Sequence, residues 1–364
     1  MIEKTIHRFQ GRQGAVEEKH VLLKVTDPSL PFEAQLSALK AAYAEVTEGT
    51  DVLIRRFFLS DAANQKDAVV RAFDACPACA TSVVQQAPLD GTKLAAWLWC
   101  ARGLKVEGST ASHNGYEHHF AAGLEAPGKG SEAQMGAIFR DYDAELGRRE
   151  MSVARNCVRT WIFVRDVDTN YAGVVKGRRD YFDAIGLTAQ THYVASTGIG
   201  GTFALPAKLV GMDAYAVGGL APGQVRYLYA ADHLSPTALY GVTFERGAAV
   251  SYGDRKHVFI SGTASIDPAG QVVHPGDPVR QTGRLLENVG ALLSEAGSSF
   301  DDVRMALVYL RDTADYVRVK ASFERLCPSL RPLYLLAPVC RPAWLVEMEC
   351  LAVAPACGNP YPDL

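Results

Sequence analysis

The stretch Tyr309-Leu310-Arg311-Asp312 closes an apolar run that begins at Val303, and the same pattern occurs twice earlier in the chain. The earlier copies are Phe58-Leu59-Ser60-Asp61 and Phe163-Val164-Arg165-Asp166. In each copy, an aspartate follows a strand-like run and stands where it can cap the helix that comes next. Three copies in register predict three versions of one structural unit.

The elements around each copy occur in a similar order, namely strand, helix, strand, helix and two further strands. The predicted helices cover 32–43, a stretch from about 64, 131–146, 172–185, 279–296 and 315–326. Ser131 and Gln134 predict a capping box at the third helix. Segments rich in Gly, Pro and Ser near 103–115 and 218–236 mark the joins.

The chain has 364 residues, too many for one ordinary core. With those two joins, the predicted units are 1–104, 105–235 and 236–357. The fold class is therefore α+β, with three tandem units of a usual domain size.

Charge and hydropathy restrict the partners and the location of the protein. The formal charge of −3 provides no basic field for nucleic acid. No apolar run of about 18 residues or basic leader is present, so we expect no membrane partner and a cytoplasmic location. His118 and His119 fall on opposite faces of a predicted strand, so they do not form a metal site together, and we expect neither metal nor cofactor.

Two carboxylates stand in the apolar closing stretch Val339 to Cys350. Glu347 and Glu349 are two positions apart, so a strand would place both on one face. That face is either an ordinary solvated face or the wall of a cleft. In a cleft, burial would raise the pKa of a carboxyl and produce a general acid.

The third copy resembles the RidA/YjgF superfamily in several motifs. These are Ser261-Gly262-Thr263 after a strand, Glu287-Asn288-Val289 in a helix, Tyr309-Leu310-Arg311-Asp312, and the closing Val346 to Val353. The resemblance implies RidA-like, chorismate-mutase-like units, each a mixed sheet with two helices on one face. Small members of the superfamily form trimers.

Two segments are also similar to the chorismatases, multi-lobed relatives of RidA. Val339-Cys340-Arg341 with Leu345-Val346-Glu347 resembles their closing motif, and Arg159 to Asp168 is a looser match. The resemblance implies that Glu347 protonates the enol ether of chorismate and that Cys340 influences the product. The chain departs from this family at Val175-Lys176-Gly177-Arg178, where an Asn-x-Gly-Arg stretch is expected.

Three units in one chain can bury their sheet faces around a pseudo-threefold axis, as trimers do with separate chains. The fold prediction is thus an intramolecular pseudo-trimer, for which oligomerisation is not required. Its clefts would lie between neighbouring units, and Glu347 would be the acid of one active cleft. We expect a small carboxylated metabolite as its partner.

The candidate substrate-binding residues come from the second and third units. They are Arg341, Cys340, Gly262, Thr263, Ser261, Arg178 and Tyr193. The arginine that holds a substrate carboxylate is either Arg341 or one from the second unit; the alternatives are an ion pair for Arg341 and a solvated basic face for Arg178. The alternative for the glycine in Ser261-Gly262-Thr263 is a β-bulge.

Three functions remain open. The first is a cofactor-free, chorismatase-like enzyme that protonates and cleaves an enol ether with release of pyruvate. The second is a RidA-type enamine or imine deaminase. The third is a non-catalytic protein that binds a small molecule and regulates.

Overall fold

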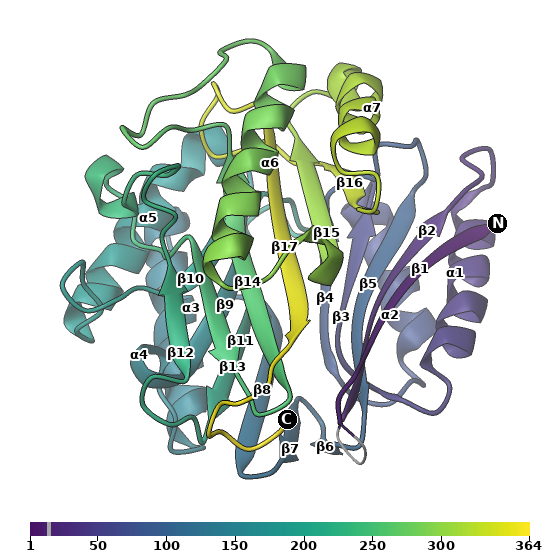
Figure 1. Ribbon diagram of the computed structural model, residues 1–364. Coiled ribbons are helices and arrows are strands. Elements are labelled where there is room, and N and C mark those ends of the chain that lie inside the picture. Colours follow the sequence, from purple (N-terminus) through teal and green to yellow (C-terminus); the bar gives the residue numbers. More distant parts are fainter. Residues whose placement is uncertain (13–15) are drawn as a thin grey trace.

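The computed structural model describes residues 1–12 and 16–364 and consists of three sheets (Figure 1). The first has the order β1-β2-β5-β3-β4. Its strands are β1 (Ile2–Gln10), β2 (Glu17–Val25), β3 (Asp51–Leu59), β4 (Ala80–Gln85) and β5 (Leu94–Arg102), and its helices are α1 (Phe32–Thr47) and α2 (Ala62–Phe73). Strand β1 was not predicted from the sequence and pairs antiparallel with β2.

The second sheet has six strands in the order β10-β9-β11-β8-β7-β6. They are β6 (Lys105–Glu107), β7 (Thr110–His113), β8 (Tyr116–Leu124), β9 (Cys157–Val164), β10 (Ala195–Gly200) and β11 (Val210–Gly218). Its helices are α3 (Gly130–Gly147), α4 (Val153–Asn156) and α5 (Val167–Ala184). Strand β10 pairs parallel with β9, whereas β11 pairs antiparallel with both neighbours, so the sheet is mixed.

The third sheet also has six strands, in the order β12-β13-β14-β17-β15-β16. They are β12 (Val225–Leu228), β13 (Gly247–Ser251), β14 (Arg255–Ala264), β15 (Val303–Leu310), β16 (Leu333–Leu336) and β17 (Val346–Pro355). The helices are α6 (Pro278–Glu295) and α7 (Tyr316–Leu326), with 3-10 turns η1 (Thr237–Tyr240), η2 (Phe300–Asp302) and η3 (Thr313–Asp315). Because β12 belongs to this sheet, the sheet begins before residue 236, the predicted start of the third unit.

The helix caps agree only partly with the sequence. Asp61 accepts a hydrogen bond from the Asn64 backbone, and Asp312 caps η3, the turn that leads into α7. Asp166 instead has a left-handed backbone and makes no side-chain cap. The capping box predicted at α3 is wrong, because the Ser131 hydroxyl donates to the Asn170 carbonyl of α5.

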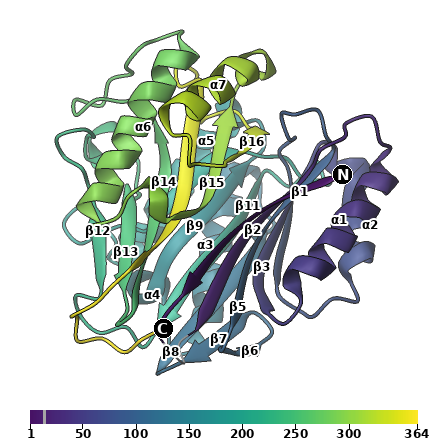
Figure 2. The ribbon, with the colours of Figure 1, turned by 45° about the vertical axis from the view of Figure 1, so that its right-hand side comes forward.

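The sheets face one another and the helices lie outside them (Figures 1 and 2). Alternation along β5 explains this layering, because Trp97 and Trp99 enter the central core while Leu98 and Cys100 pack under α1 and α2. Aromatic rings from the three units meet at the centre. The Trp99 ring centroid lies 5.3 Å from that of Tyr215 and 6.2 Å from that of Phe259.

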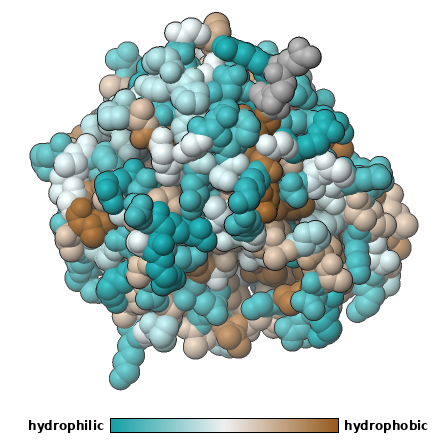
Figure 3. All heavy atoms as spheres, turned by 90° about the horizontal axis from the view of Figure 1, so that it is seen from below, coloured by the Kyte–Doolittle hydropathy of each residue, from teal (hydrophilic) through white to brown (hydrophobic). Residues whose placement is uncertain are grey.

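This arrangement confirms the predicted fold of three RidA-like α+β units in a pseudo-trimer. Seen from below, hydrophobic residues on the surface are scattered among hydrophilic ones (Figure 3). Within the described part of the chain, no helix combines the length and the apolar character needed to cross a membrane.

Candidate active site

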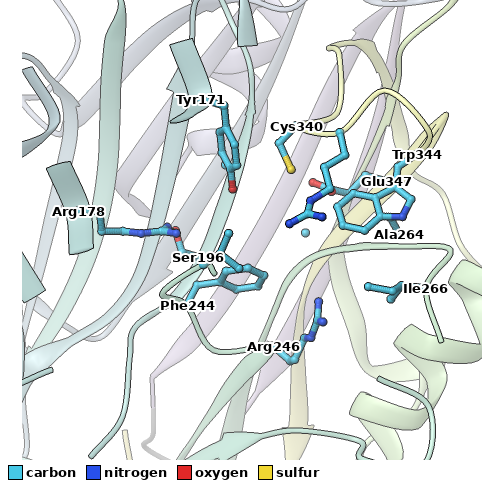
Figure 4. A pocket seen from close by; sticks show the side chains of 14 residues that line it. Tyr171, Arg178, Ser196, Phe244, Arg246, Ala264, Ile266, Cys340, Trp344 and Glu347 are labelled. Atoms are coloured by element: carbon cyan, nitrogen blue, oxygen red, sulfur yellow. The ribbon is translucent and has the colours of Figure 1, made fainter. Parts of the chain in front are cut away.

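A cleft with about 480 Å³ of empty volume lies between the second and third units. The second unit contributes α5 and β10, and the third contributes β14, β17 and the segments that precede β13 and β17 (Figure 4). The lining residues are Tyr171, Arg178, Ser196, Gly198, Val242, Phe244, Arg246, Gly262, Ala264, Ile266, Cys340, Arg341, Trp344 and Glu347.

Glu347 is the acid of this cleft, and its side chain extends from β17. The residue is only 4% exposed. Burial, and secondarily the charge of Glu349, raises the pKa of the Glu347 carboxyl to about 8, although Arg246 and Arg159 act in the opposite direction. The group is therefore protonated at neutral pH and able to donate a proton.

Glu349 lies on the same strand and is completely buried. Its carboxylate pairs with Arg159 of β9 and accepts hydrogen bonds from the Thr197 hydroxyl and from the Tyr309 hydroxyl, the latter at 2.7 Å. Within the described residues, by contrast, no group donates a hydrogen bond to Glu347. Of the two acids predicted to share a face, Glu349 is held by an ion pair across the seam, which is the boundary between two neighbouring units. Glu347 has no such partner among the described residues and can donate its proton.

Gly262 lies directly beside the Glu347 carboxyl. A Cβ at this position would lie 2.3 Å from Glu347 Oε1, so only glycine leaves room for the acid. The pairing of β14 with β17 shifts register between Ile260 and Thr263. The register shift agrees with the β-bulge interpretation, and the group that comes close to the backbone at this glycine is the Glu347 carboxyl.

Ser261 and Thr263, the neighbours of Gly262, do not line the cleft. The Ser261 hydroxyl donates to the Glu245 carbonyl at 2.6 Å, and the Thr263 hydroxyl donates to the Ser261 carbonyl at 2.9 Å. The strand alternation that brings Gly262 to the cleft turns both hydroxyls away from it.

Three arginines line the same cleft as the acid. Arg178 of α5 is 2% exposed, and its Nε donates to the Thr243 hydroxyl at 3.0 Å. Its Nη2 is buried and has no hydrogen-bond partner in the part of the chain that the structure describes. Arg341 lies over the Trp344 ring, 5.3 Å from the centroid, and Arg246 donates to the Ser235 carbonyl at 2.9 Å.

Cys340 and Tyr171 also line the cleft, Tyr171 from the same helix as Arg178 and Cys340 from the segment that precedes β17 (Figure 4). Burial, and then the charge of Glu347, raises the pKa of the Cys340 thiol to about 12, so the thiol is neutral. Burial also raises the pKa of Tyr171 well above its ordinary value. A neutral thiol is a poor nucleophile, and Cys340 contributes to the cleft as a lining residue.

The structure brings Glu347, Arg341, Cys340, Gly262 and Arg178 together in one cleft. Tyr193 lies instead in a neighbouring cavity with Glu245 and donates its backbone N–H to the Glu245 carboxylate at 2.8 Å. Strand β10 begins only at Ala195, which leaves Tyr193 outside it.

Nine of the fourteen lining residues were not predicted as site residues, among them the large side chains of Tyr171, Phe244, Arg246 and Trp344. Tyr171 could have been found, because it lies seven positions before Arg178 and therefore on the same side of α5. Arg246 and Phe244 come from an irregular segment after η1, where no periodicity indicates the direction of a side chain.

Comparison with known proteins gives a consistent result. The family model described as "Endoribonuclease L-PSP" matches residues 248–354. The 3-aminoacrylate deaminase RutC of Acinetobacter baylyi is 35% identical over 97 residues, which are 26% of this chain and 77% of that protein.

A crystal structure of a chorismatase resembles the whole molecule. Its TM-score is 0.67 at 19% sequence identity, and the match covers 93% of this chain and 99% of that chain. At this identity, the similarity shows the fold, including the multi-lobed arrangement of the units. The family match in the third unit and the shared fold of all three together show that the chain belongs to the RidA/YjgF (L-PSP) superfamily, with a chorismatase-like arrangement of its units.

Proposed function

We propose that the cleft containing Glu347 protonates and cleaves the enol ether of a small carboxylated substrate such as chorismate, with release of pyruvate. The observation that carries this proposal is a buried, neutral carboxylic acid in a cleft that three arginines also line. Among the lining residues that the structure describes, Glu347 is the only acid, so the cleft is cationic and suits an anionic substrate.

The chemistry needs no group beyond the chain and water. Glu347 donates its proton to the terminal methylene carbon of the enol ether, and the positive charge develops at the ether-bearing carbon. Water adds to that carbon and loses a proton to the Glu347 carboxylate. Glu347 is then protonated again, and the hemiketal breaks the C–O bond to the leaving group while its hydroxyl proton passes to the leaving oxygen, which gives pyruvate and an alcohol.

The arginines hold the substrate. Arg178 offers its buried Nη2, which has no partner among the described residues, to a substrate carboxylate, and such charge-assisted hydrogen bonds are strong. Trp344 and Phe244 supply apolar surface for a ring. The neutral Cys340 thiol lies beside the acid and limits where water can approach.

A second candidate is a RidA-type deaminase, favoured by the identity of 35% to the 3-aminoacrylate deaminase. Glu347 would then protonate the carbon of an enamine, and water would displace ammonia. The two functions use the same acid but different substrates.

The test incubates the purified protein with chorismate and follows pyruvate by coupled reduction to lactate. We expect release of pyruvate, and we expect the Glu347→Gln variant to lose about 10²- to 10⁴-fold in rate, the usual contribution of a general acid. Glu324→Gln is the matched control, because that side chain is 63% exposed on α7. Full turnover by Glu347→Gln would refute the assigned role.

Incubation with 3-aminoacrylate, with ammonia as the readout, distinguishes the second candidate. Release of ammonia without release of pyruvate would replace the first function by the second. Thermal stabilisation by chorismate without turnover would instead favour a binding protein.

A further inference from the structure

A second cleft, with about 1090 Å³ of empty volume, lies between the first and second units. Strand register shows that it is the equivalent of the Glu347 cleft. Thr81 pairs with Arg55, and Ser196 pairs with Thr160. Arg55 and Thr160 both stand three residues before the phenylalanine of their repeated motif, so Thr81 and Ser196 occupy the same position in the two clefts.

The helices agree with this correspondence. Lys66 and Tyr171 each stand five residues after the aspartate of their motif, and Phe73 and Arg178 each stand twelve residues after it. All four line their respective clefts. The first-unit helix therefore offers a lysine and a phenylalanine where the second-unit helix offers a tyrosine and an arginine.

The opposite wall corresponds as well, except for the acid. Gly123 directly precedes Leu124, which pairs with Met212 of β11. Gly262 directly precedes Thr263, which pairs with Met348 of β17, so the two glycines correspond. At the position of Glu347, however, the second unit has Gly211, where an added Cβ would lie 2.6 Å from the Phe203 ring. This cleft lies at the position equivalent to the Glu347 cleft but has a glycine where that cleft has its acid.

The arginine of this cleft lies on a strand, whereas Arg178 of the Glu347 cleft lies on a helix. Arg55 of β3 is 7% exposed, and it donates to Thr81 at 2.8 Å, to the Tyr43 hydroxyl at 3.1 Å and to the Phe73 carbonyl at 3.3 Å. All three acceptors are neutral, and the ion pairs of residues 1–12 and 16–364 include none to Arg55. A buried guanidinium without a carboxylate partner is costly, so an anion that entered the cleft would be stabilised.

The remaining walls define the rest of the ligand. Apolar surface comes from Phe57, Val69, Phe73 and Val83, and the Arg55 guanidinium lies 5.6 Å from the centroid of the Phe73 ring. Lys66 lies at the cleft as a further cation, while Lys208 is already paired with Glu125. The planar guanidinium fork fits a carboxylate, and the apolar wall fits a ring.

We propose that this seam is a second, non-catalytic binding site for a small organic carboxylate with an apolar ring, held by Arg55. The proposal stands on the first two units alone and does not depend on the reaction at Glu347. A ligand here would join the first unit to the second and stabilise their contact.

The experiment uses the full chain labelled with ¹³C in its valine methyl groups, with benzoate as the probe. Val70 and Val83 report on the second cleft, and Val242 reports on the Glu347 cleft. We expect benzoate to shift the Val70 and Val83 resonances saturably. Benzamide, the neutral analogue, should need a concentration about ten-fold higher or more, because it lacks the charge that pairs with Arg55.

Two variants locate the site. Arg55→Met removes the charge and should weaken benzoate binding at this cleft about ten-fold or more. Val83→Trp fills the half-buried wall without touching Arg55, and should abolish the shift at Val70 while pyruvate release is unchanged. Val317→Trp, at an exposed site on α7, is the control for an added indole and should bind benzoate as the unmodified chain does.

Three results would overturn the proposal. The first is a benzoate shift at Val242 with none at Val70 or Val83. The second is equal affinity for benzoate and benzamide, which would indicate an apolar cavity only. The third is complete displacement of benzoate by equimolar inorganic phosphate. If Arg55→Met does not fold, the Val83→Trp variant and the benzamide comparison still decide the outcome.

Discussion

The cleft between the first and second units and the cleft between the second and third units each bury one acid at the same position of a strand, but only the latter has a further acid two positions earlier on that strand. Asp213 pairs with Trp161 in strand register and Glu349 pairs with Leu307, at corresponding positions of their units. Asp213 forms a fully buried ion pair with Arg56 and accepts from the Ser82 hydroxyl at 2.7 Å.

Glu349 is held in the same manner by Arg159 and Thr197 of the preceding unit. The paired acid thus recurs, and it joins one unit to the next. The acid two positions earlier is Glu347 in one seam and Gly211 in the other. The difference teaches that the acid of the ion pair and the acid proposed as proton donor are separate residues, although they lie two positions apart on one strand.

Removing one partner of either ion pair should have the largest effect. Arg159→Met and Arg56→Met each leave a buried carboxylate uncompensated, so each should lower the free energy of unfolding by about 3–5 kcal/mol. Urea denaturation measures both values. Arg149→Met, whose partner Glu117 is 40% exposed, should cost less than about 1 kcal/mol. If only one of Arg159→Met and Arg56→Met caused a large loss in the free energy of unfolding, the two ion pairs would not be equivalent.

Glu347→Gln should stabilise the protein in a pH-dependent manner. The pKa of Glu347 is raised from 4.5 to about 8, so the folded state retains a proton that the unfolded state loses as pH rises above 4.5. The unmodified protein therefore loses stability between pH 4.5 and 8, and the glutamine variant does not. We expect the difference to grow to roughly 4 kcal/mol at pH 8.

Thermal unfolding at pH 5 and pH 8 measures this difference, with Glu324→Gln as the exposed control. The same protonation should govern activity. Because the acid form donates the proton, turnover should fall as pH rises through about 8. An unchanged stability difference between the two pH values would show that Glu347 is not held neutral by burial.

Introducing the missing acid should be tolerated poorly. Gly211→Glu places a side chain against Phe203, whose Cζ would lie 2.6 Å from the new Cβ, so we expect a loss of about 1–3 kcal/mol in the free energy of unfolding. Chemical denaturation tests this loss, and combining the change with Phe203→Ala should recover part of it. Full stability of the single variant would mean that this seam can accept an acid.

Conservative replacement of a binding arginine should have the smallest effect. Arg178→Lys loses the hydrogen bonds to Thr243 and Ser196 and the planar fork, so KM for chorismate should rise about ten-fold with a smaller change in kcat. Arg179→Lys is the control, because Arg179 only donates to the Gly241 carbonyl from the exposed side of α5. Equal KM values for the two variants would exclude Arg178 from substrate binding.

Local pattern was enough to predict most of the fold. The repeated motif ending in Asp61, Asp166 and Asp312 located the same strand in each unit, because buried strands have a characteristic apolar run. Strand β1 escaped prediction because its residues are mostly polar and half-exposed. The cap at Asp166 failed because a side-chain cap depends on a backbone angle that composition does not determine.

The candidate site was predicted less completely. Glu347, Cys340, Arg341 and Gly262 were found because they lie in or beside motifs that resemble known families. Arg246 was missed because it reaches the cleft from an irregular segment. Ser261 was assigned to the cleft, although alternation along β14 turns its hydroxyl away.

The sequence by itself determined the threefold repetition and the common face of Glu347 and Glu349, because side-chain alternation along a strand is a local property. Only the tertiary structure decided which of the two is paired. The partner of Glu349 is Arg159, which lies 190 positions away in another unit. Burial and charge pairing arise from contacts between units, so the neutral state of Glu347 and the unbalanced charge of Arg55 exist only once the three units close around their axis.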